Sequence, residues 1–378
     1  MKRSLINKAT ALILASVLLF SFAACAKKEA APALKDCAIS HDEKFGGVYA
    51  NISIDDFNAL GFEYGDSLKV TFSNGYAFDD LPYYNGYYVD IDEPLVVAYP
   101  GYPYVEVQVN YGADVWQTAE LDGDMTVTIE RVEQGKYIKT QNACNIQYSD
   151  EQGETSDVQF GNFRAVKVGN LRENVLYRGA SPIDNKHNRA AVVDRLIADA
   201  GVNFVIDLSD DPYDVGRHIS ADDFNSPYFR SLYESDKVAA LGLSAQFKSE
   251  AFGLGLAEGL TKASQNDGPY FVHCVEGKDR TGFVMMILEA LAGASYKEIV
   301  DDYMLTYDNY YGINETSDKE RYDTIKTRNI EMMLGYLTGS DAAVYTTADL
   351  QPYAEEYLVR IGMTSDAVAA LKANLTGE

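Results

Sequence analysis

The chain has little of the material from which metal and nucleic-acid sites are built. Its 378 residues include only 4 His and 4 Cys, and because these are scattered without ligand spacing, no metal site is predicted. Basic residues are also scarce, since 32 Lys and Arg face 57 Asp and Glu for a net charge of −25. Such an acidic chain is a poor partner for nucleic acid. An anionic ligand must therefore be attracted by positive charge that is local to its site.

Long apolar runs are absent beyond residue 24, so no later segment is predicted to cross a bilayer. The run that does occur, Ala9 to Ala24, follows the basic residues Lys2, Arg3 and Lys8 and indicates an export signal over residues 1–24. Its end resembles a bacterial lipoprotein signal, with lipid expected on Cys25; an ordinary secretory signal is the alternative. We therefore expect an extracytoplasmic protein that meets the cell membrane only through its lipid anchor.

The remaining length suits two domains. After an anchor and tether over residues 25–40, a period of two predicts strands over residues 41–140, as where Val105, Val107 and Val109 alternate with polar residues. This half is expected to be a small all-β barrel or sandwich, followed by a polar linker over residues 141–157. Its binding partner is not indicated by the sequence.

A Tyr-rich run lies within the predicted β domain, from Tyr83 to Tyr104. These side chains could form a binding face for glycans or a protein partner. The alternative is structural, since Tyr favours strands on a half-buried sheet.

Strands and helices alternate over residues 158–378. A buried strand is predicted over residues 202–208, a helix over residues 248–264, and a helix that begins at the capping box of Ser295 and Glu298. This alternation predicts an α/β domain whose mainly parallel sheet is flanked by helices.

The most informative segment runs from His273 to Gly282, between a predicted strand and a predicted apolar helix. A loop at a helix N-terminus directs backbone N–H groups toward one point and favours negative charge there. Cys274 in such a loop is expected to be a thiolate near neutral pH. Arg280 adds the planar fork that binds two phosphate oxygens. The segment therefore predicts phosphoryl transfer to sulfur.

The same segment resembles the protein tyrosine phosphatase superfamily, through Cys274, five intervening residues, Arg280 and Thr281. The phrase Gly-Lys-Asp-Arg-Thr-Gly over residues 277–282 is similar to a bacterial branch that includes tyrosine and dual-specificity phosphatases. Further likeness occurs at residues 177–179, 205–208 and 302–303, so the resemblance covers roughly residues 160–312.

The resemblance implies a role for each loop residue. Cys274 is the nucleophile, Arg280 binds phosphate and stabilises the transition state, and Thr281 stabilises the thiolate. His273 orients the loop from behind. The residues expected to bind substrate are Val275, Glu276, Gly277, Lys278 and Gly282. This chemistry needs no metal and no cofactor.

The general acid is less clear from the sequence. Many members of the superfamily use an Asp about 30 residues before the Cys, but no Asp lies between Asp236 and Asp267, and no Trp-Pro-Asp phrase occurs. Asp279 is therefore the candidate acid, with orientation of Arg280 as its alternative role. Asp236, Asp210 and Asp211 are the other candidates.

The expected activity is hydrolysis of a phosphate monoester by a cysteinyl-phosphate mechanism, with a phosphotyrosine protein as the first candidate substrate. Lys278 supplies a second cation, which suits phosphoinositides or inositol phosphates; pairing with Glu276 is its alternative role. Arg178 could reach the site, but a structural ion pair is the preferred interpretation. A sulfurtransferase and a phosphate-binding module are more distant alternatives.

Two cysteines remain outside these assignments. Cys37 and Cys144 bracket the predicted β domain, and outside the cytoplasm they could form a disulfide. Two unlinked thiols are the alternative.

Overall fold

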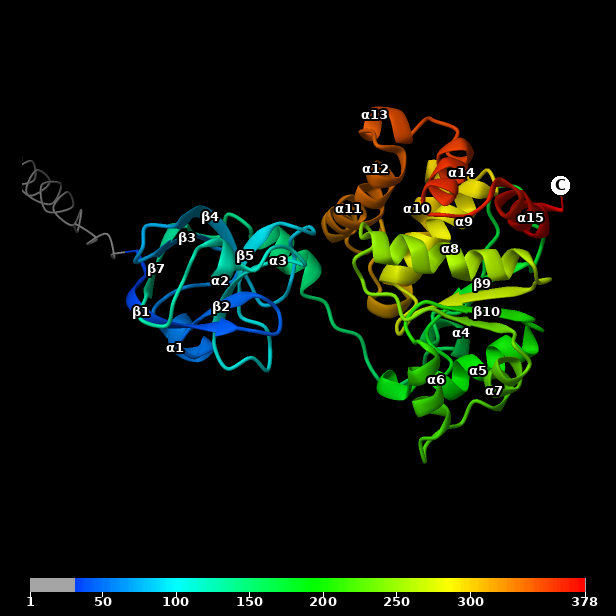
Figure 1. Cartoon of the computed structure of the whole chain (residues 1–378), viewed down its shortest axis with the longest axis horizontal. Coiled ribbons are helices and arrows are strands. Elements are labelled where there is room, and N and C mark those ends of the chain that lie inside the picture. The colour runs from blue at the N-terminus through cyan, green and yellow to red at the C-terminus, as the bar shows by residue number, and fades with distance from the viewer. Residues whose placement is uncertain (1–30, 378) are drawn as a thin grey trace, which may run out of the picture.

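In the first half of the chain, seven strands close into a barrel (Figure 1). The computed structural model describes residues 31–377, so the predicted export signal and Cys25 lie outside it. The strands follow the order β1-β2-β6-β5-β4-β3-β7. Their bounds are β1 Ala33–Asp42, β2 Gly47–Ala50, β3 Ser67–Phe72, β4 Ala77–Tyr84, β5 Pro94–Val97, β6 Val105–Val109 and β7 Thr126–Glu133. The helices of this half are α1 Ile54–Ala59, α2 Val115–Thr118 and α3 Ile138–Cys144.

The barrel interior is apolar, with buried Val70, Val107 and Ile129 among its members. In β6 the polar residues that alternate with the valines do not face water, because Glu106 is fully buried and Gln108 is 6% exposed. The hydroxyl of Tyr87 donates a hydrogen bond of 2.6 Å to Gln108. The alternating pattern therefore identified the strand, but it did not reveal that a second layer of side chains covers its outer face.

The barrel begins at Ala33, inside the segment that was expected to be a tether. Strand β1 is required there because it pairs with both β2 and β7 and so closes the barrel. The predicted linker also begins in ordered structure, since its first residues belong to α3.

Cys37 and Cys144 are both free, which is the second of the two alternatives considered. Cys37 lies in β1 opposite Val127, whereas Cys144 ends α3. Burial raises the pKa of both thiols. The disulfide suggested by their positions in the sequence is therefore absent from the described structure.

The second half is built on a sheet of order β11-β10-β12-β9-β8, in which all pairs but β8–β9 are parallel. The strand bounds are β8 Arg164–Ala165, β9 Leu176–Gly179, β10 Phe204–Asp207, β11 Val238–Ala240 and β12 Tyr270–His273. The helices before α9 are α4 Asp157–Phe160, η1 Asn185–His187, α5 Ala190–Asp199, α6 Pro212–Ile219, α7 Pro227–Glu234 and α8 Glu250–Ser264. The later ones are α9 Asp279–Leu291, α10 Tyr296–Tyr311, α11 Lys319–Lys326, η2 Thr327–Glu331, α12 Met332–Thr338, α13 Ala342–Tyr345, α14 Gln351–Arg360 and α15 Ser365–Thr376.

Helices cover both faces of this sheet (Figure 1). Successive strand residues point to opposite faces, so Phe204 and Ile206 join the core beneath α8 and α9, while Val205 joins the core beneath α5 and α7. The predicted α/β layering is thus present, with the carboxyl ends of β10, β11 and β12 at one edge. Loops that follow these strands meet at that edge, as expected for a site in such a sheet.

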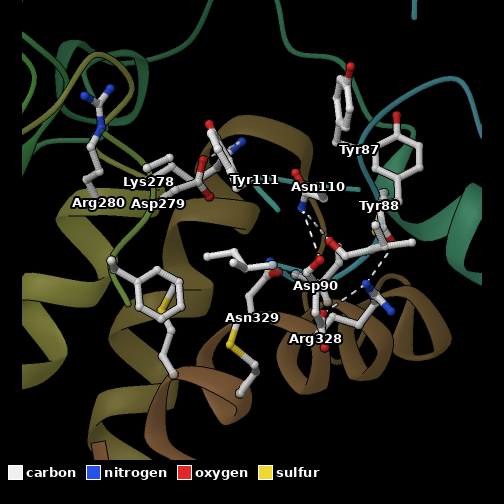
Figure 2. A pocket seen from close by; sticks show the side chains of 18 of the residues that line it. Tyr87, Tyr88, Asp90, Asn110, Tyr111, Lys278, Asp279, Arg280, Arg328 and Asn329 are labelled. Atoms are coloured by element: carbon white, nitrogen blue, oxygen red, sulfur yellow. Dashed lines mark hydrogen bonds and ion pairs between the residues drawn. The ribbon is translucent and has the colours of Figure 1, made fainter. Parts of the chain in front are cut away.

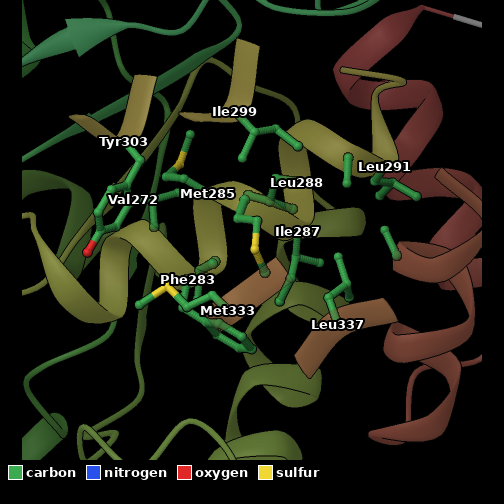
Figure 3. Packing of buried hydrophobic residues seen from close by; sticks show 14 of the residues in the cluster. Val272, Phe283, Met285, Ile287, Leu288, Leu291, Ile299, Tyr303, Met333 and Leu337 are labelled. Carbon is green, nitrogen blue, oxygen red and sulfur yellow. The ribbon is translucent and has the colours of Figure 1, made fainter. Parts of the chain in front are cut away.

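Helix α9 is the centre of the larger core. All of its residues from Thr281 onward are buried, including Met285, Leu288 and Leu291 (Figure 3). Burial of each such side chain contributes about 1.5–3 kcal/mol. The helix that follows the Cys274 loop is therefore held firmly, which fixes one end of that loop.

The helical segment over residues 319–338 is not continuous. It is divided into α11, a π-helical segment η2 and α12. Among residues 31–377, no helix has the length and apolar character needed to cross a membrane.

Candidate active site

The Cys274 loop connects the end of β12 to the start of α9 and leaves its own amides unpaired. None of the backbone N–H groups of residues 275–280 donates a hydrogen bond to an acceptor within the described chain. Only Gly277 among these six residues is buried, so the unpaired donors are open to an acceptor from outside the chain. Because these donors lie just before and in the first turn of the 13-residue helix α9, the loop is suited to receive an anion.

The loop turns at Gly277, whose φ is +67°. The carbonyl oxygen of Gly277 accepts hydrogen bonds from Arg178 Nη2 at 3.0 Å and from Asn162 Nδ2 at 3.3 Å. The carbonyl of Val275 accepts from the amide of Ser181 at 3.1 Å. The loop carbonyls therefore point outward to fixed donors, which leaves the amides free on the inner side.

A buried ion cluster holds Arg178 in place. Its Nη1 lies 2.6 Å from Asp302 of α10, and Arg164 lies 2.7 Å from the same carboxylate. Burial opposes ionisation of Asp302, but the two guanidinium groups hold its pKa well below the usual range. Burial and the Asp302 charge raise the pKa of the neighbouring Glu289 well above its ordinary value. The structural ion pair preferred for Arg178 is therefore present.

Cys274 lies at the base of the loop and is 3% exposed. Thr281 Oγ1 is also buried and has no hydrogen-bond partner in residues 31–377. His273 is fully buried behind the loop, with Nδ1 3.8 Å from Asp207 Oδ1. Burial lowers the pKa of His273 to about 4, so its ring is neutral and suited to packing rather than to proton transfer.

Arg280 donates through Nη1 to the carbonyl oxygen of Leu243 at 2.7 Å. Leu243 belongs to the loop over residues 241–249, which connects β11 to α8. Within the described residues, no acceptor is bonded to Nε or Nη2 of Arg280. Two N–H-bearing nitrogens of the fork are thus left for a ligand.

Lys278 forms ion pairs within the loop. Its Nζ lies 3.1 Å from Glu276 and 3.7 Å from Asp279. Although burial opposes the charge, these two carboxylates raise the pKa of Lys278 well above its usual value. The pairing with Glu276 that the sequence left open is therefore formed.

Gly282, which was grouped with the substrate-binding residues, has a different position. Its amide donates to the carbonyl of Lys278 at 2.8 Å, and a β-carbon there would lie 2.4 Å from the ring of Tyr303. Gly282 thus allows α9 and α10 to approach each other, and it adds no free donor to the loop.

Of the two candidate acids Asp279 and Asp236, only Asp279 lies near Cys274 in the structure. Asp279 is in the loop, with 59% of its side chain exposed. Asp236 precedes β11 and pairs with Lys262 at 2.6 Å, so it lies at the sheet edge opposite to Cys274. The 241–249 loop, which occupies the position about 30 residues before Cys274, contains no acidic residue.

Asp210 and Asp211 follow β10 at the same edge as Cys274 but are engaged elsewhere. Asp210 pairs with His218 at 3.3 Å, and burial together with Asp207 raises its pKa. Asp211 accepts the amides of Tyr213 and Asp214 as the N-cap of α6.

A cavity of about 400 Å³ adjoins the loop, and both halves of the chain line it. Figure 2 shows Lys278 and Asp279 directed toward Tyr111 and Asn110 of the barrel, whereas Arg280 points away from them. Cys274 does not line this cavity. The cavity therefore meets the loop at residues 278–280, whose amides are among the unpaired ones.

The Tyr-rich run contributes in two ways. Tyr83 and Tyr84 are buried in the barrel, as the structural interpretation requires. Tyr87 and Tyr88 instead line the cavity beside the loop.

Several site residues could not be identified from the sequence. Glu289 could have been singled out from the sequence, since it is a lone acid within an apolar helix. No sequence pattern identifies the other site residues, because they come from segments far away in the chain. These residues are Asn162, Arg164, Tyr111 and Arg328. In the described residues, no cluster of three or more His, Cys, Asp or Glu side chains could hold a metal ion.

Residues 245–377, which include the loop, match the sequence model of the tyrosine phosphatase family. A tyrosine-protein phosphatase from Nostoc commune is 35% identical over 121 residues, which cover 30% of this chain and 41% of that protein. The chain thus spans less than half of that relative's length. A crystal structure of an uncharacterized conserved protein from Thermotoga maritima aligns over 25% of this chain and 35% of that chain, at 25% identity. Its TM-score of 0.21 is too low to indicate a shared fold. Both sequence matches are thus to tyrosine phosphatases, and the region of the family match includes the Cys274 loop.

Proposed function

We propose that this chain, whose second half matches the tyrosine phosphatase family, hydrolyses phosphate monoesters through a cysteinyl-phosphate and acts as a protein tyrosine phosphatase. The observation that carries this proposal is the set of unpaired amides over residues 275–280 around the buried Cys274. A phosphoryl group supplies the equatorial oxygens that these donors lack. A sulfur nucleophile at the base of the ring is needed for attack on phosphorus, but not for simple binding.

In the first step, Cys274 Sγ forms a bond to phosphorus as the bond from phosphorus to the leaving oxygen breaks. The protonated form of Asp279 gives its proton to that oxygen. The loop amides and Arg280 stabilise the charge on the equatorial oxygens. In the second step, water attacks phosphorus and gives its proton to Asp279, while the S–P bond breaks and releases the thiolate with help from the Thr281 hydroxyl.

Cleavage of an aryl phosphate by the purified chain from residue 26 tests this mechanism. We expect hydrolysis in the presence of a metal chelator, loss of activity in Cys274→Ser, and full activity in Cys37→Ser, a matched thiol in β1 of the barrel. Inactivity in the chelator, or an unchanged rate in Cys274→Ser, would show that the proposed mechanism is wrong.

The second candidate substrate class is phosphoinositides and inositol phosphates. It is favoured by Lys278, a cation beside the free amides, although this cation is paired with Glu276 and Asp279. A panel of phosphotyrosine peptides, phosphoinositides and phytate, assayed under one set of conditions, distinguishes the two classes by kcat/KM.

We also propose export and lipid attachment at Cys25. The apolar segment that ends in Ala-Ala-Cys supports this proposal. Incorporation of a labelled fatty acid into the wild-type protein but not into Cys25→Ala is the expected result; labelling of both proteins contradicts it.

A further inference from the structure

The cavity beside the Cys274 loop has one wall from the barrel and one from the second domain. The barrel contributes the segment from Tyr87 to Ile91, together with Asn110 and Tyr111. The second domain contributes residues 278–280 of the loop, residues of the 241–249 loop and residues of α10, α11, η2 and α12. The barrel therefore forms part of the cavity that adjoins residues 278–280 of the loop.

The barrel wall is tied directly to the second domain. Arg328 of η2 donates through Nη2 to the carbonyl of Tyr88 at 2.7 Å, and the same nitrogen lies 3.3 Å from the carboxylate of Asp90. Figure 2 shows this contact at the side of the cavity away from Arg280. Asn110 Nδ2 in turn donates to the carbonyl of Val89 at 2.9 Å. The turn that carries Tyr111 is thereby linked to η2 through two hydrogen-bonded steps.

A second contact holds the two domains together. Helix α3 packs on α11, and Lys139 pairs with Glu320 across this contact at 3.0 Å. Gln141 of α3 donates through Nε2 to Asn85 of the barrel at 2.7 Å. The barrel wall is thus fixed at two places.

Tyr111 is the unusual member of the wall. Its φ is +51°, a left-handed conformation that is uncommon for a bulky residue and costs on the order of 1–2 kcal/mol. Burial of the side chain does not offset this cost, since the residue is 53% exposed. The strained backbone instead presents the ring to the cavity, on the side of Lys278 and Asp279 (Figure 2).

The chemistry of the cavity favours an aromatic ligand. Most of its lining is aromatic or aliphatic, as with Phe247, Tyr307 and Met332. Its cations outside Arg280 are already paired, Lys278 with Glu276 and Asp279, and Arg328 with Asp90. A second phosphate on the ligand would have to displace these carboxylates, whereas a neutral ring would not.

We propose that Tyr111 is a specificity-determining residue whose ring packs on the aryl group of a phosphotyrosine-type substrate held by the Cys274 loop. The barrel is then part of the substrate site and not a separate module. This inference rests on the proposed function, because it concerns the leaving group of the same reaction.

The test uses Tyr111→Asn and Tyr111→Phe in the purified protein. Asn removes the ring but accepts a positive φ, so the unfolding temperature is expected to be equal to or higher than that of the wild type. We expect the KM for a phosphotyrosine peptide to rise about 3- to 10-fold in Tyr111→Asn, the size of a ring–ring contact, with kcat changed less than about twofold. Tyr111→Phe should behave as the wild type.

Competitive inhibition by inorganic phosphate reports on the loop alone, and its inhibition constant is expected to stay unchanged in Tyr111→Asn. The matched control is Tyr99→Asn, an exposed barrel tyrosine that does not line this cavity; its KM should equal that of the wild type. An unchanged KM in Tyr111→Asn, or equal rises in KM and in the phosphate inhibition constant, overturns the inference while leaving the proposed function in place. An inactive wild-type protein overturns the proposed function itself.

Discussion

Gly277 lies so close to Gly179 that a β-carbon on Gly277 would stand 2.1 Å from the Gly179 carbonyl oxygen. Strand β9 therefore fixes the position of the Cys274 loop, since its backbone and the Arg178 side chain both contact Gly277, at which the loop turns. No side chain at position 277 fits this contact without movement of the loop.

Gly277→Ala is expected to lower kcat/KM by more than about 100-fold, because displacement of the loop misplaces the amides and Arg280 together. Steady-state kinetics on an aryl phosphate measures this loss. Gly201→Ala is the matched control, since Gly201 has a φ of +64° and no atom within 4 Å of its added β-carbon. It should lose only about 1–2 kcal/mol of stability and no activity. Equal activity in the two variants would contradict the proposed role of this contact.

Thr281→Val should separate stability from turnover. The buried Oγ1 has no partner among the described residues, so its loss should leave the free energy of unfolding unchanged or increased. We expect kcat to fall about 10-fold, with accumulation of cysteinyl-phosphate in rapid-quench experiments, because the thiolate loses its donor as it leaves. Thr281→Ser, which keeps the hydroxyl, should retain the rate; a rate loss without accumulated intermediate argues against this role.

Asp279→Asn should affect poor leaving groups most. A general acid contributes about 100-fold or more when the leaving oxygen needs a proton, and much less when it does not. We expect a large fall in kcat for phenyl phosphate and a small one for p-nitrophenyl phosphate. Asp236→Asn, at the opposite sheet edge, should leave both rates unchanged. An equal effect of Asp279→Asn on both substrates removes Asp279 as the acid.

Glu106→Gln should stabilise the protein at alkaline pH. Burial and the Asp42 charge raise the pKa of Glu106 to about 8 from an ordinary value of 4.5. The folded state therefore holds a proton that the unfolded state has lost between these pH values, and the stability of the wild type falls as pH rises through that window. The gain from Gln is as much as about 5 kcal/mol above pH 8 and vanishes below pH 4.5. Denaturant unfolding at pH 4.5 and 8.5 measures it; a gain independent of pH would contradict this origin.

The sequence was sufficient for the features that depend on local pattern. The strand predicted over residues 202–208 is observed as β10, and the capping box at Ser295 is formed as expected. The Cys274 loop could be located because strand, loop and helix are consecutive in the chain. The prediction of a tether up to residue 40 was wrong because Ala33–Asp42 lacks the alternating pattern of a strand. This segment becomes a strand only by pairing with β2 and β7.

The supports of the site could not be predicted because they depend on distant segments. Asp302 binds Arg164 and Arg178 across more than a hundred residues, and no spacing rule connects them. The same is true of the barrel wall, since Tyr111 and Arg328 become neighbours of Lys278 only when the domains pack. A single sequence carries no record of these packings.

The contact between Arg328 and Tyr88 spans 240 residues of chain, which has a consequence for biosynthesis. The barrel can close as soon as β7 has been made, whereas η2 and α12 emerge from the ribosome much later. During that interval the wall of the cavity has no surface on which to dock. Folding therefore passes through a stage in which a finished barrel coexists with an incomplete cavity, and the site is complete only once the segment around Arg328 has folded.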